Sequence, residues 1–186
     1  MDSALPLQKR DIGLSEKLKS LRLLLLDVDG VMTDGCLLYH ADGTESKSFH
    51  VRDGLGLRLL MESGIQAGIV TGRVSGALQR RCLDLNIDLI YEGILNKADV
   101  LSAIQKTTGV EAEHIGFVGD DIIDLPLIRL VGFSAAPADA HPLVLETVDF
   151  VTRTTGGNGV VREVVEKILQ VQGKWQWALE WFYKKR

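Results

Sequence analysis

The sequence predicts an α/β protein, a three-layer sandwich in which helices cover both faces of a central parallel sheet. Short apolar runs of strand length alternate with helical patterns through most of the chain, and this alternation is typical of repeated βαβ units. The first run, residues 21–29, contains four consecutive leucines, Leu23–Leu26. A continuously apolar run of this length fits a strand that is covered on both faces.

The other elements follow from the same alternation. Further strands are predicted at residues 66–70, 89–91, 115–118, 132–134 and 149–152, and helices at 54–62, 75–85, 97–108, 124–131 and about 158–172. Strands that alternate with helices in this way run parallel within one sheet. No internal repeat or linker divides the chain, so residues 1–186 are predicted to form a single domain.

Residues 36–51 interrupt the alternation. Two short strand-like runs, 37–39 and 47–49, lie on either side of an Asp42-Gly43 pair, which is a strong signal for a hairpin turn. We therefore expect an antiparallel β-hairpin that projects from the sheet just after the first strand. A surface excursion without a role is the alternative.

The C-terminal residues 173–186 are rich in aromatic side chains and end in a basic run. They include all three tryptophans, Trp175, Trp177 and Trp181, and the spacing of Trp177 and Trp181 allows a short amphipathic helix. Three placements stay open for such a helix: against its own domain, against another subunit or on a membrane surface.

Composition excludes several classes of protein. Of the 186 residues, 46% are hydrophobic and 25% are charged, as in globular rather than disordered proteins. The net charge of −4 argues against nucleic-acid binding. The apolar runs are too short to span a membrane, and the N-terminus lacks the apolar region of a secretory signal. Cys36 and Cys82 form no metal-binding or disulfide pattern, which favours the cytoplasm.

Two carboxylates close the first predicted strand. Asp27 and Asp29 are two residues apart, so their side chains point to one face of that strand. Open α/β sheets bind ligands at the carboxyl ends of their strands. An Asp-x-Asp-Gly sequence alone is weak support for a site, because Asp and Gly also favour turns.

Three more polar groups follow at or near the ends of later strands. They are Thr71-Gly72-Arg73, then Lys97, and then the acidic group Asp120, Asp121 and Asp124. A helix cap is the alternative role for Thr71, and a solvated surface charge is the alternative for Lys97. Like charges at a buried strand end repel one another, and a divalent cation would remove that cost. We therefore expect one site that combines acids, a hydroxyl and a lysine.

This set resembles the four motifs of the haloacid dehalogenase superfamily, in family order and over nearly the whole chain. The resemblance implies a Rossmann-like fold in which Asp27 is the nucleophile and forms an aspartyl-phosphate. Asp29 would act as general acid and then as general base. An aspartate at position 29 favours phosphoryl transfer over dehalogenation.

The same resemblance implies a magnesium site and a phosphate site. Mg²⁺, which prefers oxygen ligands, would be held by Asp27, the backbone carbonyl of Asp29 and Asp120, with Asp121 in support. Thr71 would bind a phosphoryl oxygen, and Lys97 would neutralise the nucleophile and the phosphate. The segments between these motifs are too short for a cap domain, so the site would be open unless other subunits covered it.

A closer resemblance is to the 3-deoxy-D-manno-octulosonate 8-phosphate phosphatases. It is carried by residues 27–35, 49–54, 71–73, 119–121, 124–126, 138–142 and 156–163. It implies a capless, Mg²⁺-dependent homotetramer in the pathway to the lipopolysaccharide inner core. The hairpins would join at the tetramer centre, and neighbouring subunits would help to enclose each active site.

A substrate with a carboxylate and a phosphate suits arginine, whose planar fork matches two anionic oxygens. By family position, the substrate-binding residues would be Asp29, His50, Val51, Arg52, Asp53, Gly54, Arg58, Gly72, Arg73, Arg81 and Lys97. Some of these contacts would cross the subunit boundary. A surface salt bridge is the alternative for any one of the arginines.

The sequence departs from the family at two places, and three other functions stay open. Val74 stands where a second basic residue is common, and the aromatic C-terminus differs from the small-residue tail usual in the family. The runner-up enzyme is a phosphatase for a nine-carbon keto-deoxy sugar acid 9-phosphate. A phospho-receiver domain and a non-catalytic assembly module are the alternatives from other classes.

Overall fold

The computed structural model describes residues 7–184, with side chains for residues 13–181. Its centre is a six-stranded sheet in the order β5-β4-β1-β6-β7-β8. The strands are β1 (Leu23–Leu26), β4 (Gln66–Val70), β5 (Leu89–Tyr91), β6 (Ile115–Val118), β7 (Phe133–Ala136) and β8 (Phe150–Val151). Every pairing between these strands is parallel, which confirms the predicted fold class.

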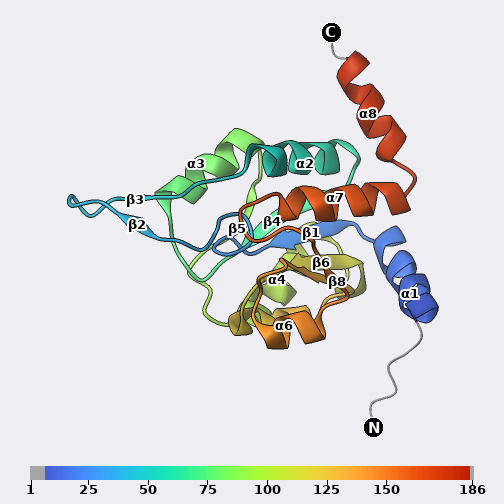
Figure 1. Cartoon of the computed structure of the whole chain (residues 1–186), viewed down its shortest axis with the longest axis horizontal. Helices are drawn as coiled ribbons and strands as arrows, with labels where there is room; N and C mark the ends of the chain where they lie inside the picture. The colour runs from blue at the N-terminus through green and yellow to red at the C-terminus, as the bar shows by residue number, and fades with distance from the viewer. Residues whose placement is uncertain (1–6, 185–186) are drawn as a thin grey trace.

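The alternation of side chains along β1 explains the three layers. Leu24 and Leu26 face one hydrophobic cluster, while Leu23 and Leu25 face another, and all four are 0% exposed. The first cluster is covered by α1 (Leu7–Lys19), α2 (Val51–Glu62), α3 (Gly76–Leu85), α7 (Val160–Val171) and α8 (Trp175–Lys184). The second is covered by α4 (Leu101–Thr108), α5 (Leu125–Ile128) and α6 (Pro142–Thr147). Figure 1 shows the two helix layers above and below the sheet.

The predicted hairpin forms and projects from the sheet (Figure 1). Its strands β2 (Leu38–Tyr39) and β3 (Glu45–Ser46) pair antiparallel. Gly43 lies in the turn with a φ of +84°, a conformation that glycine adopts without steric cost. The second strand was predicted at residues 47–49 but is formed by Glu45–Ser46, and the paired part is shorter than residues 36–51, the last of which begins α2.

The described part of the C-terminal segment packs on its own domain. Ala178 of α8 is 0% exposed and belongs to the same hydrophobic cluster as the buried residues of α7. Trp175 lies under the guanidinium of Arg162, 5.6 Å from the ring centroid, and Lys174 Nζ donates a hydrogen bond to the Ser63 carbonyl oxygen at 3.0 Å. Residues 185–186 of the predicted tail lie outside the described residues, as do the side chains of residues 182–184.

Several elements differ from the predicted ones. Helix α1 and helix α6 were not predicted, and neither was the 3-10 turn η2 (Ala112–His114). The expected helices 97–108 and 124–131 begin with the 3-10 turns η1 (Lys97–Val100) and η3 (Ile122–Asp124), before α4 and α5. Each turn lies in the connection between a strand and the following helix, and 3-10 turns are frequent at helix N-termini. Among residues 7–184, no helix is both long enough and apolar enough to cross a membrane.

Candidate active site

The site lies at the carboxyl ends of three adjacent strands. Asp27 directly follows β1, Thr71 directly follows β4, and Asp120 comes two residues after β6. Because β4 and β6 are the two neighbours of β1 in a parallel sheet, their carboxyl ends meet at one edge. The fold therefore brings three of the predicted motifs together.

Lys97 occupies the centre of this edge. Its side chain is 1% exposed, and Nζ lies 2.6 Å from Asp27 Oδ1 and 2.5 Å from Asp124 Oδ1. Burial alone would lower the pKa of Lys97, but the two carboxylates outweigh burial and hold the pKa above its ordinary value. Lys97 is therefore a fixed positive charge beside Asp27, and not the surface lysine of the alternative interpretation.

Asp124 holds both Lys97 and the acidic loop in place. It is 0% exposed, and its Oδ2 accepts hydrogen bonds from the backbone N–H of Asp120 at 2.8 Å and of Asp121 at 3.2 Å. The sequence motif contained Asp124, but no site role was predicted for it. One signal in the sequence could have identified this role. Asp124 lies four residues after Asp120, and an aspartate at such a short distance can accept hydrogen bonds from the backbone of the turn.

The acidic side chains form a potential metal site. Asp27, Asp120 and Asp124 each offer a carboxylate oxygen, and these oxygens lie within 4.8 Å of one another. Burial, together with repulsion between the carboxylates, raises the pKa of Asp27 to about 6 and that of Asp120 to about 8. Since Asp124 already binds Lys97 and the backbone, Asp27 and Asp120 have the oxygens that fit a hard divalent cation.

Two other acids lie beside this cluster. Asp121 is exposed, and its Oδ1 accepts a hydrogen bond from the Ile122 N–H at 2.7 Å, so it stabilises the loop that carries Asp120. Asp29 is half-buried and forms an ion pair with Lys47. Lys47 was not among the predicted site residues, because in the sequence it resembles an ordinary solvated residue of the hairpin.

The Thr71-Gly72-Arg73 segment connects the strand edge to the hairpin. Thr71 is 2% exposed, and its hydroxyl oxygen accepts a hydrogen bond from the Arg73 N–H at 3.4 Å. Arg73 Nη2 lies 3.0 Å from both the Tyr39 hydroxyl and Glu45 Oε2. Arg73 Nε lies 3.7 Å from Asp29 Oδ2. Arg73 thus joins the hairpin to the carboxyl ends of β1, β4 and β6, which carry Asp27, Thr71 and Asp120 and are called the catalytic edge below.

The remaining predicted substrate residues gather elsewhere, just before and along α2. They are His50, Val51, Arg52, Asp53, Gly54 and Arg58, with Arg81 of α3 beside them. Arg81 Nη2 donates to the His50 carbonyl at 3.3 Å, and Arg58 Nη2 donates to the Asp84 carbonyl at 2.7 Å. Within residues 13–181, none of the hydrogen bonds or ion pairs of this group reaches Asp27, Asp29 or Lys97.

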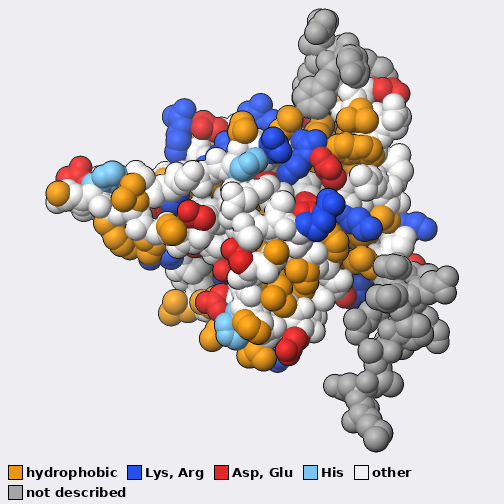
Figure 2. Space-filling model, in the orientation of Figure 1, with side chains coloured by type: hydrophobic (Ala, Val, Ile, Leu, Met, Phe, Trp, Pro, Cys, Tyr) orange, Lys and Arg blue, Asp and Glu red, His pale blue; other side chains and the backbone are white. Residues whose placement is uncertain are grey.

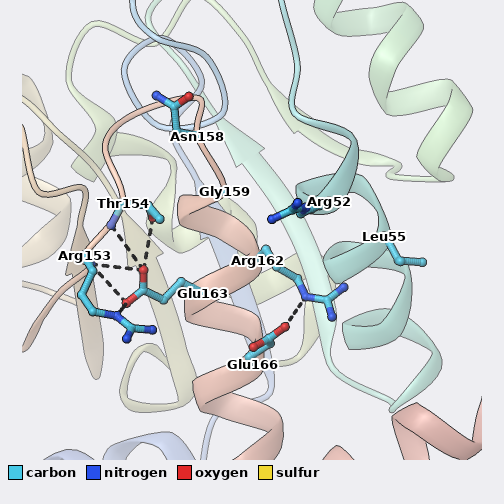
Figure 3. A pocket seen from close by; sticks show the side chains of 9 residues that line it. All are labelled: Arg52, Leu55, Arg153, Thr154, Asn158, Gly159, Arg162, Glu163 and Glu166. Atoms are coloured by element: carbon cyan, nitrogen blue, oxygen red, sulfur yellow. Dashed lines mark hydrogen bonds and ion pairs between the residues drawn. The ribbon is translucent and has the colours of Figure 1, made fainter.

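Two cavities adjoin this second group. One, of about 350 Å³, is lined by Val51, Gly54, Leu55, Arg58, Arg81, Asp84 and Leu85. The other, of about 560 Å³, lies between α2 and the start of α7 and is lined by Arg52 from α2 and Arg162 from α7 (Figure 3). Asp53 is buried between these helices, and its Oδ1 accepts a hydrogen bond from the Arg162 N–H at 2.7 Å. Burial raises the pKa of Asp53.

A buried lysine between carboxylates, at the carboxyl edge of a parallel sheet, fits the active site of a haloacid dehalogenase-like enzyme. Residues 85–164 match the family described as haloacid dehalogenase-like hydrolase. The chain is 44% identical over 158 residues to the 3-deoxy-D-manno-octulosonate 8-phosphate phosphatase KdsC of Escherichia coli K12, covering 85% of this chain and 84% of that protein. It is 46% identical over 161 residues to KdsC of Haemophilus influenzae, covering 87% and 89%. The chain belongs to the 3-deoxy-D-manno-octulosonate 8-phosphate phosphatase family and is a phosphomonoesterase.

Solved structures agree with this assignment. The Moraxella catarrhalis phosphatase, in complex with magnesium, phosphate and 3-deoxy-D-manno-octulosonate (KDO), has a TM-score of 0.88 and 39% identity, covering 91% of this chain and 97% of that one. The cobalt-bound Haemophilus influenzae enzyme has a TM-score of 0.83 and 46% identity, covering 86% and 93%. Together with the acidic cluster, these structures assign a divalent cation to the site, and Mg²⁺ is the predicted ion.

Proposed function

We propose that the protein hydrolyses 3-deoxy-D-manno-octulosonate 8-phosphate to the free sugar acid and phosphate, through an aspartyl-phosphate on Asp27. The observation that carries this proposal is the contact between Lys97 and Asp27, which sets a permanent positive charge 2.6 Å from the proposed nucleophile. The relatives named above support the choice of substrate.

The proposed reaction has two steps. In the first, a carboxylate oxygen of Asp27 attacks phosphorus, the bond between phosphorus and the sugar oxygen breaks, and Asp29 gives its proton to that oxygen. In the second, water attacks phosphorus and passes a proton to Asp29, while the acyl-phosphate bond breaks and restores Asp27. Lys97 neutralises the charge on Asp27 and the phosphoryl group, and the Thr71 hydroxyl binds a phosphoryl oxygen.

The residues that would hold Mg²⁺ are Asp27, Asp120 and the backbone carbonyl of Asp29, with Asp121 supporting the loop. When bound, the cation supplies positive charge that stabilises the transferring phosphoryl group. Its fit rests on the crowding of buried carboxylates, whose repulsion a divalent cation would relieve. Asp124 stays with Lys97 in this arrangement.

We further propose that the second group of residues serves the site of a neighbouring subunit. Arg52 and Arg58 lie on α2 and Arg81 lies on α3, without contact to Asp27 in the described structure. Their guanidinium groups would bind the carboxylate end of a substrate held by the catalytic residues of another copy. His50 and Gly54 would contribute backbone groups there.

A homotetramer assembled through the hairpin would bring these parts together. Leu37, Leu38 and Tyr39 of the hairpin are 41%, 59% and 60% exposed, and Figure 2 shows hydrophobic side chains along this projection. Exposed hydrophobic side chains gathered on a projecting element are typical of an interaction surface. We place the reaction in the cytoplasm, within lipopolysaccharide inner-core synthesis.

The decisive experiment is phosphate release with Mg²⁺ from the eight-carbon acid phosphate, its nine-carbon analogue and simple sugar phosphates. We expect preference for the eight-carbon substrate and loss of activity with EDTA. Preference for the nine-carbon analogue would identify the runner-up enzyme. A tetramer without any hydrolysis would identify an assembly module, and Asp27→Asn serves as the inactive control.

A further inference from the structure

Lys47 is a second buried lysine that reaches the catalytic edge. Its Nζ forms an ion pair and hydrogen bond with Asp29 Oδ1, and its side chain is 1% exposed. The other oxygen, Asp29 Oδ2, is buried and accepts no hydrogen bond from residues 13–181. The two oxygens of Asp29 are therefore distinct: Oδ1 is bound by Lys47, whereas Oδ2 has the Arg73 guanidinium at 3.7 Å but accepts no hydrogen bond.

Lys47 comes from the hairpin, one residue after β3. The base of the hairpin is fixed by Arg73, whose Nη2 contacts Glu45 of β3 and Tyr39 of β2, each at 3.0 Å. Arg73 Nε also lies 3.7 Å from Asp29 Oδ2. These contacts fix the position of Lys47 relative to Asp29, so the hairpin places a residue in the site of its own subunit.

A purely structural ion pair explains this contact poorly. Removing the Lys47 ammonium group and most of the Asp29 carboxylate from water costs free energy that such a pair seldom recovers, and hydrophobic side chains would hold the hairpin at least as well. The more exposed pair Lys17–Asp149, with side chains 43% and 26% exposed, does not bear this cost to the same degree. A buried cation on a carboxylate is better explained where the orientation of that carboxylate matters.

We propose that Lys47 is a positioning residue for Asp29. It binds Oδ1 and so fixes the plane of the carboxyl group with Oδ2 directed to the reacting groups. This inference rests on the proposed function. In the first step the proton on Oδ2 passes to the sugar oxygen as its bond to phosphorus breaks. In the second step Oδ2 takes a proton from the attacking water, and Lys47 keeps its protons throughout.

The test compares two substrates with the Lys47→Met variant. The sugar-acid phosphate has a poor leaving group that needs a proton, whereas 4-nitrophenyl phosphate has a good leaving group that departs without one. A well-placed general acid contributes at least about 100-fold. Imperfect placement of Asp29 should therefore lower kcat/KM for the sugar-acid phosphate by about tenfold or more, with a change of less than about threefold for 4-nitrophenyl phosphate.

Three further variants make the comparison specific. Lys17→Met removes the same side chain from the ion pair with Asp149 and should leave both substrates unaffected. Lys47→Arg keeps the charge and should recover most of the loss. In an Asp29→Asn background, Lys47→Met should cause no further loss, because a residue that acts through Asp29 has nothing left to position.

Equal losses on both substrates would overturn the proposal, because they would mean that Lys47 binds phosphate or supports the fold. An additive loss in the Asp29→Asn background would overturn it as well. Thermal unfolding checks that each variant is folded, and Lys47→Ala takes the place of the methionine variant if that one is not. A wild-type protein inactive on both substrates would instead overturn the proposed function, and with it any part for Lys47 in this reaction.

Discussion

Asp124 Oδ1 lies 2.5 Å from Lys97 Nζ, and both side chains are almost completely buried. The same carboxylate accepts hydrogen bonds from the backbone of the Asp120 loop through Oδ2. One residue therefore fixes a cation beside Asp27 and also fixes the loop that carries a proposed metal ligand. This double contact makes Asp124 a support for the whole catalytic edge.

Asp124→Asn should destabilise the protein and reduce its activity. The amide keeps a carbonyl oxygen for the backbone but removes one of the two negative charges that compensate Lys97. Breaking a buried ion pair of this kind should lower the free energy of unfolding by about 3 kcal/mol. Urea denaturation measures this change. The matched control is Asp84→Asn, which breaks the exposed pair with Arg80 and should cost roughly 0.5 kcal/mol. Equal effects of the two substitutions would contradict a special role for Asp124.

The catalytic edge could be predicted from the sequence because it depends on strand ends. Asp27 and Thr71 each follow a continuous apolar run, and a parallel sheet necessarily brings such positions together. The contact of Lys47 with Asp29 could not be predicted. It depends on the direction in which the hairpin folds back, and that direction is fixed by Arg73 across 28 residues of chain.

The helices likewise include some that the sequence pattern predicts and some that it does not. Helix α7 has a strongly amphipathic pattern and was predicted within two residues of its observed ends. Helix α1 was missed, because its sequence is mostly polar and its burial depends on a few side chains such as Leu18. Tertiary packing, rather than local pattern, stabilises a helix of that kind.

Mg²⁺ should bind more tightly as the pH rises from about 6 to about 8. Burial and neighbouring carboxylates raise the pKa of Asp120 to about 8, so the metal has to displace a proton below that pH. Because the Asp120 pKa is higher in the folded protein than in the unfolded chain, the metal-free protein should also become less stable as the pH rises toward 8. The affinity should rise by up to about tenfold per pH unit. Calorimetry in buffers of different ionisation enthalpy counts the released protons, and a pH-independent affinity would contradict this prediction.

Gly30→Ala should abolish metal binding. Gly30 has a φ of +94°, and a Cβ at this position would overlap the carboxylate of Asp120. Gly64 offers a matched control, because its φ is +88° and a Cβ there would meet no atom within 4 Å. Both substitutions strain the backbone, but only Gly30→Ala displaces the carboxylate that we propose as a metal ligand. A Mg²⁺ titration compares the two variants, and normal affinity in Gly30→Ala would rule out Asp120 as a ligand in its observed position.

Two inactive variants should restore activity when they are co-expressed. Asp27→Asn removes the nucleophile but keeps Arg81, whereas Arg81→Ala keeps the nucleophile but removes a proposed substrate contact. If Arg81 serves the site of a neighbouring subunit, a mixed oligomer contains some sites with both groups intact. Each variant alone should lose activity by about 100-fold or more, and co-expression should recover a substantial fraction of it. Native mass spectrometry has to show that mixed oligomers form. Mixed oligomers without recovered activity would mean that Arg81 serves its own subunit, because then no site in the mixture would hold both residues.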